Sequence, residues 1–254
     1  MNIDWNTTFA AIYRSRSNCL RAVQRIDPVG LNDLVGIDEQ VRLLETNTRR
    51  FLDGMPANNV LLWGPRGTGK SSLIKALLNA YSEQGLRIIE VDKDDLVLLP
   101  EIVDEIRDLT QFHFIVFCDD LSFEEGERTY KALKSALDGS IELPPENVLV
   151  YATSNRRHLV PEYMEENLRA TYKGGQIHHD EAVEEKISLS ERFGLWVSFY
   201  PVDRQGYLAI VDSLFPDWSG DRSVLHEAAW AFALRRGSHN GRIAQQFFRH
   251  FAVS

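Results

Sequence analysis

Residues 64–71 read Gly-Pro-Arg-Gly-Thr-Gly-Lys-Ser, and this stretch decides the fold because it matches the phosphate-binding pattern G-x-x-x-x-G-K-S/T at every fixed position. An apolar run at 59–63 precedes it and fits a buried strand, while residues 71–84 carry apolar side chains at helical spacing. Backbone N–H groups and the helix dipole converge on an anion at such a strand–turn–helix junction. The sequence therefore predicts a nucleotide site here.

Contacts with the nucleotide are expected from both the backbone and the side chains of this loop. Lys70 is expected to reach the β- and γ-phosphates, and the Ser71 hydroxyl to bind Mg²⁺. The full set of loop residues expected to bind the nucleotide is Gly64, Pro65, Arg66, Gly67, Thr68, Gly69, Lys70, Ser71 and Ser72. A glycine turn without a ligand is the alternative, which the flanking strand and helix disfavour.

Apolar strands alternate with amphipathic helices through the middle of the chain. Strands are expected at 59–63, 86–91, 112–118, 147–152 and 195–200, and helices at 38–52, 71–84, 99–110 and 126–137. This alternation predicts an α/β fold of the P-loop NTPase kind, a three-layer sandwich with a parallel five-stranded sheet. A small C-terminal helical lid is expected to follow, with helices at about 203–214, 221–236 and 240–251.

This pattern predicts that the chain is divided into three regions. We expect a helical lead-in at 1–30, the nucleotide-binding domain at 31–202 and the lid at 203–254. The stretch 156–190 is acidic and poorly periodic, and a segment of that kind inside a compact domain is usually functional or mobile.

Composition and charge narrow the class of protein. Among the 254 residues, 44% are hydrophobic and no apolar run approaches the roughly 20 residues that span a bilayer. The N-terminus lacks the pattern of a secretion signal, and Cys19 and Cys118 are far apart, so we expect a reducing cytoplasm and no membrane. The net charge of −9 disfavours nucleic acid as a partner, although the arginines of 14–25 and 235–254 leave that partner open.

Two aspartates follow the apolar run at 112–118. An acid at the carboxyl end of a buried strand beside the phosphate loop is where such folds hold Mg²⁺. We therefore place Asp119 near the metal and expect Asp120 to face the attacking water as a general base. The alternative is that these acids only cap the following helix.

From about residue 33 to its C-terminus the chain resembles the AAA+ ATPases, and it is most similar to an uncharacterised bacterial AAA+-like family of unknown function. The resemblance implies that Leu34 and Val35, in Asp33-Leu34-Val35-Gly36, pack against the adenine. It also implies that Asn155, in Ala152-Thr153-Ser154-Asn155-Arg156, is the sensor-one residue that positions water.

The same resemblance implies two arginines that act on the γ-phosphate. Arg192, in Ser190-Glu191-Arg192-Phe193-Gly194, occupies the box where arginine fingers lie, so it would serve the nucleotide of a neighbouring copy in a homo-oligomer. Arg242 follows Gly237-Ser238-His239-Asn240-Gly241 and opens a lid helix in the manner of sensor two. From the residues alone, an arginine before an apolar strand, such as Arg192, is more often part of a surface ion pair than a finger. Arg242 fits the solvated face of its helix equally well.

Three functions remain open. The first is a slow ATPase that binds ATP, ADP and Mg²⁺ and acts on an unknown protein client. The strand ends in Asp-Asp where many AAA+ members have Asp-Glu, so a nucleotide-dependent binding module with little hydrolysis is the second. The third is a nucleic-acid-associated loader, because initiator and helicase-loader members also carry two aspartates there. The GTPase pattern Asn-Lys-x-Asp is absent, and His178-His179-Asp180 lacks the further ligands of a zinc site.

Overall fold

The computed structural model describes residues 3–122, 133, 137, 143–155, 172–173, 176–177 and 191–251. Seven strands form the main sheet in the order β2-β1-β4-β5-β6-β3-β9. Their bounds are β1 (Ala10–Arg14), β2 (Cys19–Ala22), β3 (Val60–Trp63), β4 (Leu86–Glu90), β5 (His113–Cys118), β6 (Val148–Ser154) and β9 (Leu195–Ser198). A separate two-stranded pair consists of β7 (Tyr172–Lys173) and β8 (Gln176–Ile177).

The helices in the described residues are α1 (Asp38–Leu52), α2 (Lys70–Tyr81), α3 (Leu99–Ile106), α7 (Arg204–Leu214), α8 (Arg222–Arg236) and α9 (Gly241–Phe251). Short 3-10 turns are η1 (Ser15–Ser17), η2 (Leu31–Asp33), η3 (Ser82–Gln84) and η4 (Lys93–Leu98). The strands predicted between residues 59 and 200 and the helices predicted at 38–52, 71–84, 99–110, 203–214, 221–236 and 240–251 all occur, with boundaries that differ by at most a few residues. The helix predicted at 126–137 lies outside the described residues except for positions 133 and 137.

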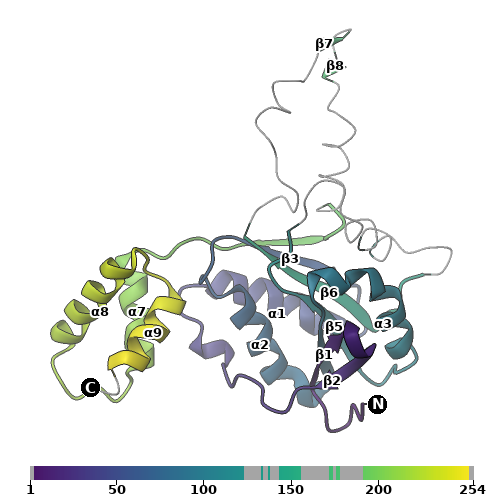
Figure 1. Ribbon diagram of the computed structural model, residues 1–254, viewed down its shortest axis with the longest axis horizontal. Coiled ribbons are helices and arrows are strands. Elements are labelled where there is room, and N and C mark those ends of the chain that lie inside the picture. Colours follow the sequence, from purple (N-terminus) through teal and green to yellow (C-terminus); the bar gives the residue numbers. More distant parts are fainter. Residues whose placement is uncertain are drawn as a thin grey trace.

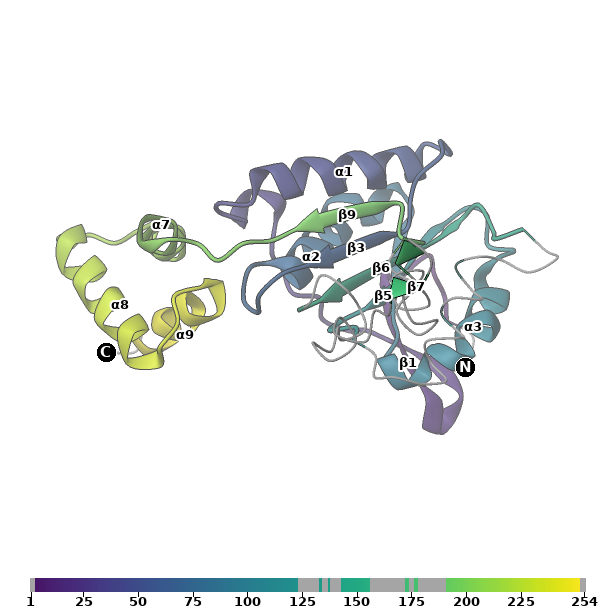
Figure 2. The same ribbon diagram turned by 90° about the horizontal axis from the view of Figure 1, so that it is seen from above.

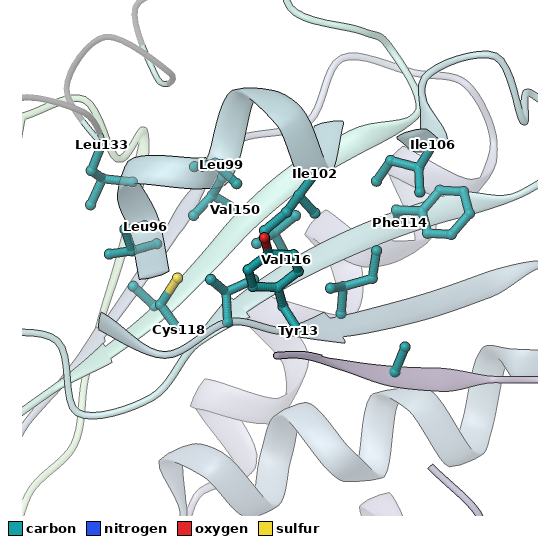
Figure 3. Close-up of a cluster of buried hydrophobic side chains, with 14 of the residues drawn as sticks. Tyr13, Leu96, Leu99, Ile102, Ile106, Phe114, Val116, Cys118, Leu133 and Val150 are labelled. Carbon is teal, nitrogen blue, oxygen red and sulfur yellow. The ribbon is translucent and has the colours of Figure 1, made fainter. Parts of the chain in front are cut away.

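Two hydrophobic layers cover the two faces of the sheet, because side chains alternate along each strand. On β5, Ile115 and Phe117 pack with the apolar side chains of α1 and α2. Phe114 and Val116 face the other way and join the cluster that includes Ile102 of α3. Figure 3 shows this second cluster, with the helical side chains above the strands that they cover. The chain is thus a three-layer α/β sandwich.

The sheet has seven strands, so the prediction of five was too low. The predicted helical lead-in at 1–30 is also wrong, because its residues include the hairpin β1–β2. Strand β1 pairs with β4 in parallel, with Ala10 opposite Ile88, while β2 is antiparallel to β1. The apolar residues that suggested one face of a helix instead complete the edge of the sheet, where pairing with β4 outweighs local periodicity.

Arg87 ties the N-terminal residues to the sheet from inside the protein. Its side chain is 4% exposed, and its guanidinium donates hydrogen bonds to the carbonyl oxygens of Trp5 at 2.8 Å and Ser82 at 2.7 Å. The guanidinium carbon also lies 4.9 Å from the ring centre of Phe9 and 4.4 Å from that of Phe112. Arg87 therefore links the segment before β1 to the strand that β1 pairs with.

The three C-terminal helices have a hydrophobic core of their own. Tyr207 and Val211 of α7 pack there with Leu225 of α8 and Phe247 of α9. Figures 1 and 2 show these helices lying beside the sheet, at the end of the molecule opposite the N-terminal hairpin, and joined to it by the chain that follows β9. None of the helices in the described ranges is both long and apolar enough to cross a bilayer.

We predict that Arg87→Met lowers the free energy of unfolding by about 2 kcal/mol, because buried carbonyl groups lose charged donors that an apolar chain cannot replace. Urea unfolding followed by tryptophan fluorescence measures this change. Arg235→Met, at an exposed position of α8, is the matched control and should leave stability unchanged. Equal stability of the two variants would contradict the structural role given to Arg87.

Candidate functional site

Parallel pairing brings the ends of three strands to one edge of the sheet. Strand β6 pairs in parallel with β3, with Ser154 opposite Trp63, and with β5, with Ala152 opposite Cys118. The carboxyl ends of β3, β6 and β9 point toward the side on which the C-terminal helices lie (Figure 2). The phosphate loop follows β3, the paired aspartates follow β5 and Asn155 follows β6, and they therefore meet.

The backbone of the phosphate loop has a shape that glycine alone permits at two positions. Gly64 has φ of +143°, and a Cβ atom there would collide with the carbonyl oxygen of Phe199. Gly67 has φ of +80°, and a Cβ atom there would lie 2.6 Å from the side-chain amide carbon of Asn240. The loop then enters α2 at Lys70, so the free N–H groups of the first helical turn face the cleft beyond the loop. This is an anion cradle, and it fits a nucleotide phosphate.

Lys70 lies inside this cradle. Its side chain is 7% exposed, and Nζ donates hydrogen bonds to the carbonyl oxygens of Gly64 at 2.6 Å and Pro65 at 2.8 Å. Burial lowers the pKa of Lys70, while the carboxylates of Asp119 and Asp120 oppose that shift. The ammonium group is thus held by weak, neutral acceptors, which a phosphate can replace as a stronger, charged partner.

Ser71 and Asp119 form a pair of oxygen ligands next to Lys70. The Ser71 hydroxyl donates to Oδ1 of Asp119 at 2.7 Å, and the hydroxyl of Thr153 donates to the same oxygen at 2.6 Å. No described residue donates a hydrogen bond to Oδ2 of Asp119. Within the described part of the chain no cluster of three or more His, Cys, Asp or Glu could hold a metal alone. One carboxylate and one hydroxyl do fit Mg²⁺, which commonly takes its other ligands from water and substrate phosphates.

Asp120 has an unusual backbone conformation, and each of its carboxylate oxygens has a partner. Its backbone has φ of +52°, a left-handed conformation that is uncommon for a residue with a side chain. Its Oδ2 forms an ion pair with Arg66 at 2.8 Å, and its Oδ1 accepts a hydrogen bond from the side-chain amide of Asn155. The side chains of Arg66 and Asp120 are 70% and 50% exposed, so this ion pair contributes at most about 1 kcal/mol and is readily exchanged.

A cleft of about 710 Å³ extends from the loop to the C-terminal helices. It is lined by the predicted residues Leu34, Val35, Arg66, Gly67, Thr68, Gly69, Lys70, Ser71, Ser72, Asp119, Asp120, Asn155 and Arg242. Gly64 and Pro65 are not among its lining residues, and their carbonyl groups hold Lys70 instead. Apolar side chains from Pro28, Val202, Ile210 and Leu214 complete the wall beside Leu34 and Val35.

Helix α9 touches the phosphate loop directly. The N–H of Gly241 donates to the carbonyl oxygen of Gly67 at 3.1 Å, and the side-chain amide of Asn240 donates to that of Arg66 at 3.4 Å. Arg242 follows at once, exposed in the cleft and close enough that its charge lowers the pKa of Lys70. Among the described residues it has no ion-pair partner.

Arg192 is not brought to this cleft. It precedes β9, which runs parallel to β3 with Leu195 opposite Val60, so it lies at the amino edge of the sheet, away from the loop. Arg156, Ser190 and the triplet at 178–180 lie outside the described residues. The sequence analysis did not predict that Thr153 contacts the two aspartates or that Asn240 contacts the phosphate loop. The alternation of side chains along β6 was the one signal that could have indicated that Thr153 faces α2.

Comparison with known proteins gives a family and a fold. A family model described as "Protein of unknown function (DUF815)" matches residues 6–254. A search of curated proteins found no match. Two single-substitution variants of Thermotoga maritima RuvB are similar in structure, each with 14% sequence identity to this chain. The match with the first variant covers 87% of this chain and 72% of the RuvB chain, with a TM-score of 0.49. The match with the second covers 89% of this chain and 73% of the RuvB chain, with a TM-score of 0.50.

At that identity the second likeness supports the AAA+ fold and nothing beyond the fold. The family model, by contrast, spans nearly the whole sequence. The chain therefore belongs to the DUF815 family, described as a protein of unknown function.

Proposed function

We propose that this protein binds ATP with Mg²⁺ and hydrolyses the γ-phosphate slowly, as a P-loop ATPase of the AAA+ type. The observation that carries the proposal is the hydrogen bond of 2.7 Å between Ser71 at the start of α2 and Asp119 at the end of β5. It places a hydroxyl of the phosphate loop beside a carboxylate of the acidic strand end. Two neighbouring ligands of an octahedral Mg²⁺ ion lie about 3 Å apart, so the pair could open slightly to hold the ion. Bound there, Mg²⁺ would neutralise charge on the phosphate oxygens.

The cleft supports binding of the rest of the nucleotide. Its volume of about 710 Å³ lies within the range of about 300–1,000 Å³ typical of small-molecule sites. Leu34 and Val35 line it together with Ile210 and Leu214 of α7, and these apolar side chains would hold the adenine. Lys70 and the N–H groups at the start of α2 would hold the phosphates, with Arg66 and Arg242 adding positive charge.

The groups for hydrolysis lie beside these phosphate-binding groups. Asp120 would take the proton of the attacking water, and the Asn155 amide would orient both the Asp120 carboxylate and the water. Arg242, unpaired among the described residues, would stabilise charge that develops on the γ-phosphate.

One observation favours a second function, a nucleotide-dependent binding module that barely hydrolyses ATP. Both carboxylate oxygens of Asp120 are engaged, one by Arg66 and the other by Asn155. While these contacts persist, an attacking water would have to displace one of the two partners to reach the carboxylate. In this version the C-terminal helices, joined to the loop through Gly67, would present a nucleotide-dependent surface to a protein client.

We predict that Lys70→Ala abolishes measurable ATP binding while the protein stays folded, because among the described residues the lysine bonds only to loop carbonyls and to Asn155. Isothermal titration calorimetry with ATP and circular dichroism measure the two properties. Lys93→Ala in η4, outside the cleft, is the control and should bind like wild type. Wild-type ATP affinity in folded Lys70→Ala protein would overturn the proposed function.

In the same titrations, Arg242→Ala should weaken the binding of ATP more than the binding of ADP, because the γ-phosphate is its proposed partner.

We predict that Asp120→Asn keeps ATP affinity within a few-fold of wild type and lowers turnover by about 10²-fold or more, because an amide cannot accept the proton. Release of phosphate under single-turnover conditions measures the rate. Asp104→Asn, at the exposed Asp104–Arg107 pair of α3, is the control. Turnover in wild type no faster than in Asp120→Asn protein would favour the binding module over the enzyme.

We further propose that Arg192 completes the site of a neighbouring copy, since it lies at the sheet edge opposite its own cleft. Arg192→Ala protein should then bind ATP normally but lose turnover by about 10³-fold, the lower range for arginine fingers. Mixing it with Asp120→Asn protein should restore part of the activity, because each variant supplies the group that the other lacks. A strictly monomeric sedimentation profile with ATP, and no restoration on mixing, would rule this arrangement out.

A further inference from the structure

Thr153 contacts both aspartates of the candidate site with a single hydroxyl group. It lies near the end of β6, its residue is 1% exposed, and its side chain points to the face of the sheet that carries α2. Oγ1 donates a hydrogen bond to Oδ1 of Asp119 at 2.6 Å and accepts one from the backbone N–H of Asp120 at 2.9 Å. The proton and one lone pair of this hydroxyl are therefore committed to two consecutive residues.

The backbone of Thr153 holds the next residue along as well. Its carbonyl oxygen accepts a hydrogen bond from the N–H of Leu121 at 2.6 Å. Asp120 thus lies between two bonds to the same threonine. A left-handed conformation is unfavourable for a residue with a side chain, so the φ of +52° at Asp120 needs such bonds to persist.

Thr153 and Ser71 donate to the same oxygen of Asp119, at 2.6 Å and 2.7 Å. These two hydroxyls differ in what else they can do. The oxygen of Ser71 can turn a lone pair to a metal ion. Thr153 also lines the cleft, but it is almost fully buried and its hydroxyl is already committed to Asp119 and Asp120. Because water poorly replaces a donor with so little exposed surface, Thr153 fixes the direction in which the free oxygen of Asp119 points.

We propose that Thr153 is a positioning residue that orients Asp119 toward Mg²⁺ and Asp120 toward water without touching either. This inference rests on the proposed function, since it names what sets the geometry of the same site. Partners of this kind behind a metal ligand are worth 10–100-fold in metal affinity or activity, which sets the expected size of the effect at about that range.

Thr153→Val tests this role because valine keeps the shape of threonine and removes both side-chain hydrogen bonds. Calorimetry should show ATP affinity in EDTA within about twofold of wild type. The Mg²⁺ concentration that gives half of the full Mg²⁺ effect on ATP binding should rise at least tenfold, and kcat should fall 10- to 100-fold with little change in KM. Thr153→Ser retains the hydroxyl and should recover most of both losses.

Thr48→Val is the matched control. Thr48 is also fully buried, and its hydroxyl also makes two hydrogen bonds, to the carbonyl of Leu44 at 2.8 Å and to the Tyr151 hydroxyl at 3.0 Å, away from the cleft. That change should lower Tm but leave the Mg²⁺ requirement as in wild type. If Thr153→Val does not fold, Thr153→Ala is measured in its place.

Two outcomes would overturn the inference. One is a wild-type Mg²⁺ requirement in folded protein that lacks the hydroxyl, and the other is a serine variant as impaired as the valine variant. Failure of the proposed enzyme looks different: wild type would bind ATP with Mg²⁺ but not turn over. The shift in Mg²⁺ requirement for binding would then still decide the role of Thr153.

Discussion

The pairing of β6 with strands on both sides is the constraint on which the candidate site depends. β6 lies between β5 and β3, and its parallel register with each fixes where their carboxyl ends stop. A slip of one residue along β6 would turn Thr153 toward the opposite face of the sheet, away from α2 and from both aspartates. The hydrophobic residues on both faces of β6, such as Val150 and Tyr151, oppose any such slip because each would move into the wrong layer. Packing at the centre of the sheet thus fixes the polar groups at its edge.

Charge at this edge is nearly balanced within the protein itself. Lys70, Arg66 and Arg242 bring positive charge to the cleft, and Asp119 and Asp120 bring negative charge. A phosphate chain bound there, as proposed, would mainly exchange existing partners, and the solvent-exposed Arg66–Asp120 pair would be the easiest to break. Selectivity between nucleotides with different numbers of phosphates would then depend on which cations change partner, rather than on the total charge of the site.

The sequence predicted the parts of the fold that local patterns encode. The five core strands and the helices α1, α2, α3, α7, α8 and α9 have clear periodicity, and the loop has a fixed motif. The hairpin β1–β2 was missed because Phe9, Ile12 and Tyr13 fall at the i, i+3, i+4 spacing of a helix, and only the pairing with β4 shows that residues 10–14 form a strand. The pairing of Arg66 with Asp120 joins residues 54 positions apart, and no local pattern indicates it. Leu34, Val35 and Arg242 line the cleft, while the contacts with a nucleotide that the sequence predicts for them remain predictions.

The contact between Gly64 and Phe199 connects two parts of the chain that otherwise have separate tasks. Gly64 begins the phosphate loop, and Phe199 lies one residue past β9, where the chain leaves the sheet for α7. These two backbones touch with no side chain between them. The first glycine of the motif therefore also sets how closely the segment after β9 packs against the loop. Any larger residue there would displace this segment, which leads to the three C-terminal helices, along with the loop itself. A substitution of Gly64 that lowers nucleotide binding would thus act in two ways: by distorting the loop and by shifting the position of the C-terminal helices.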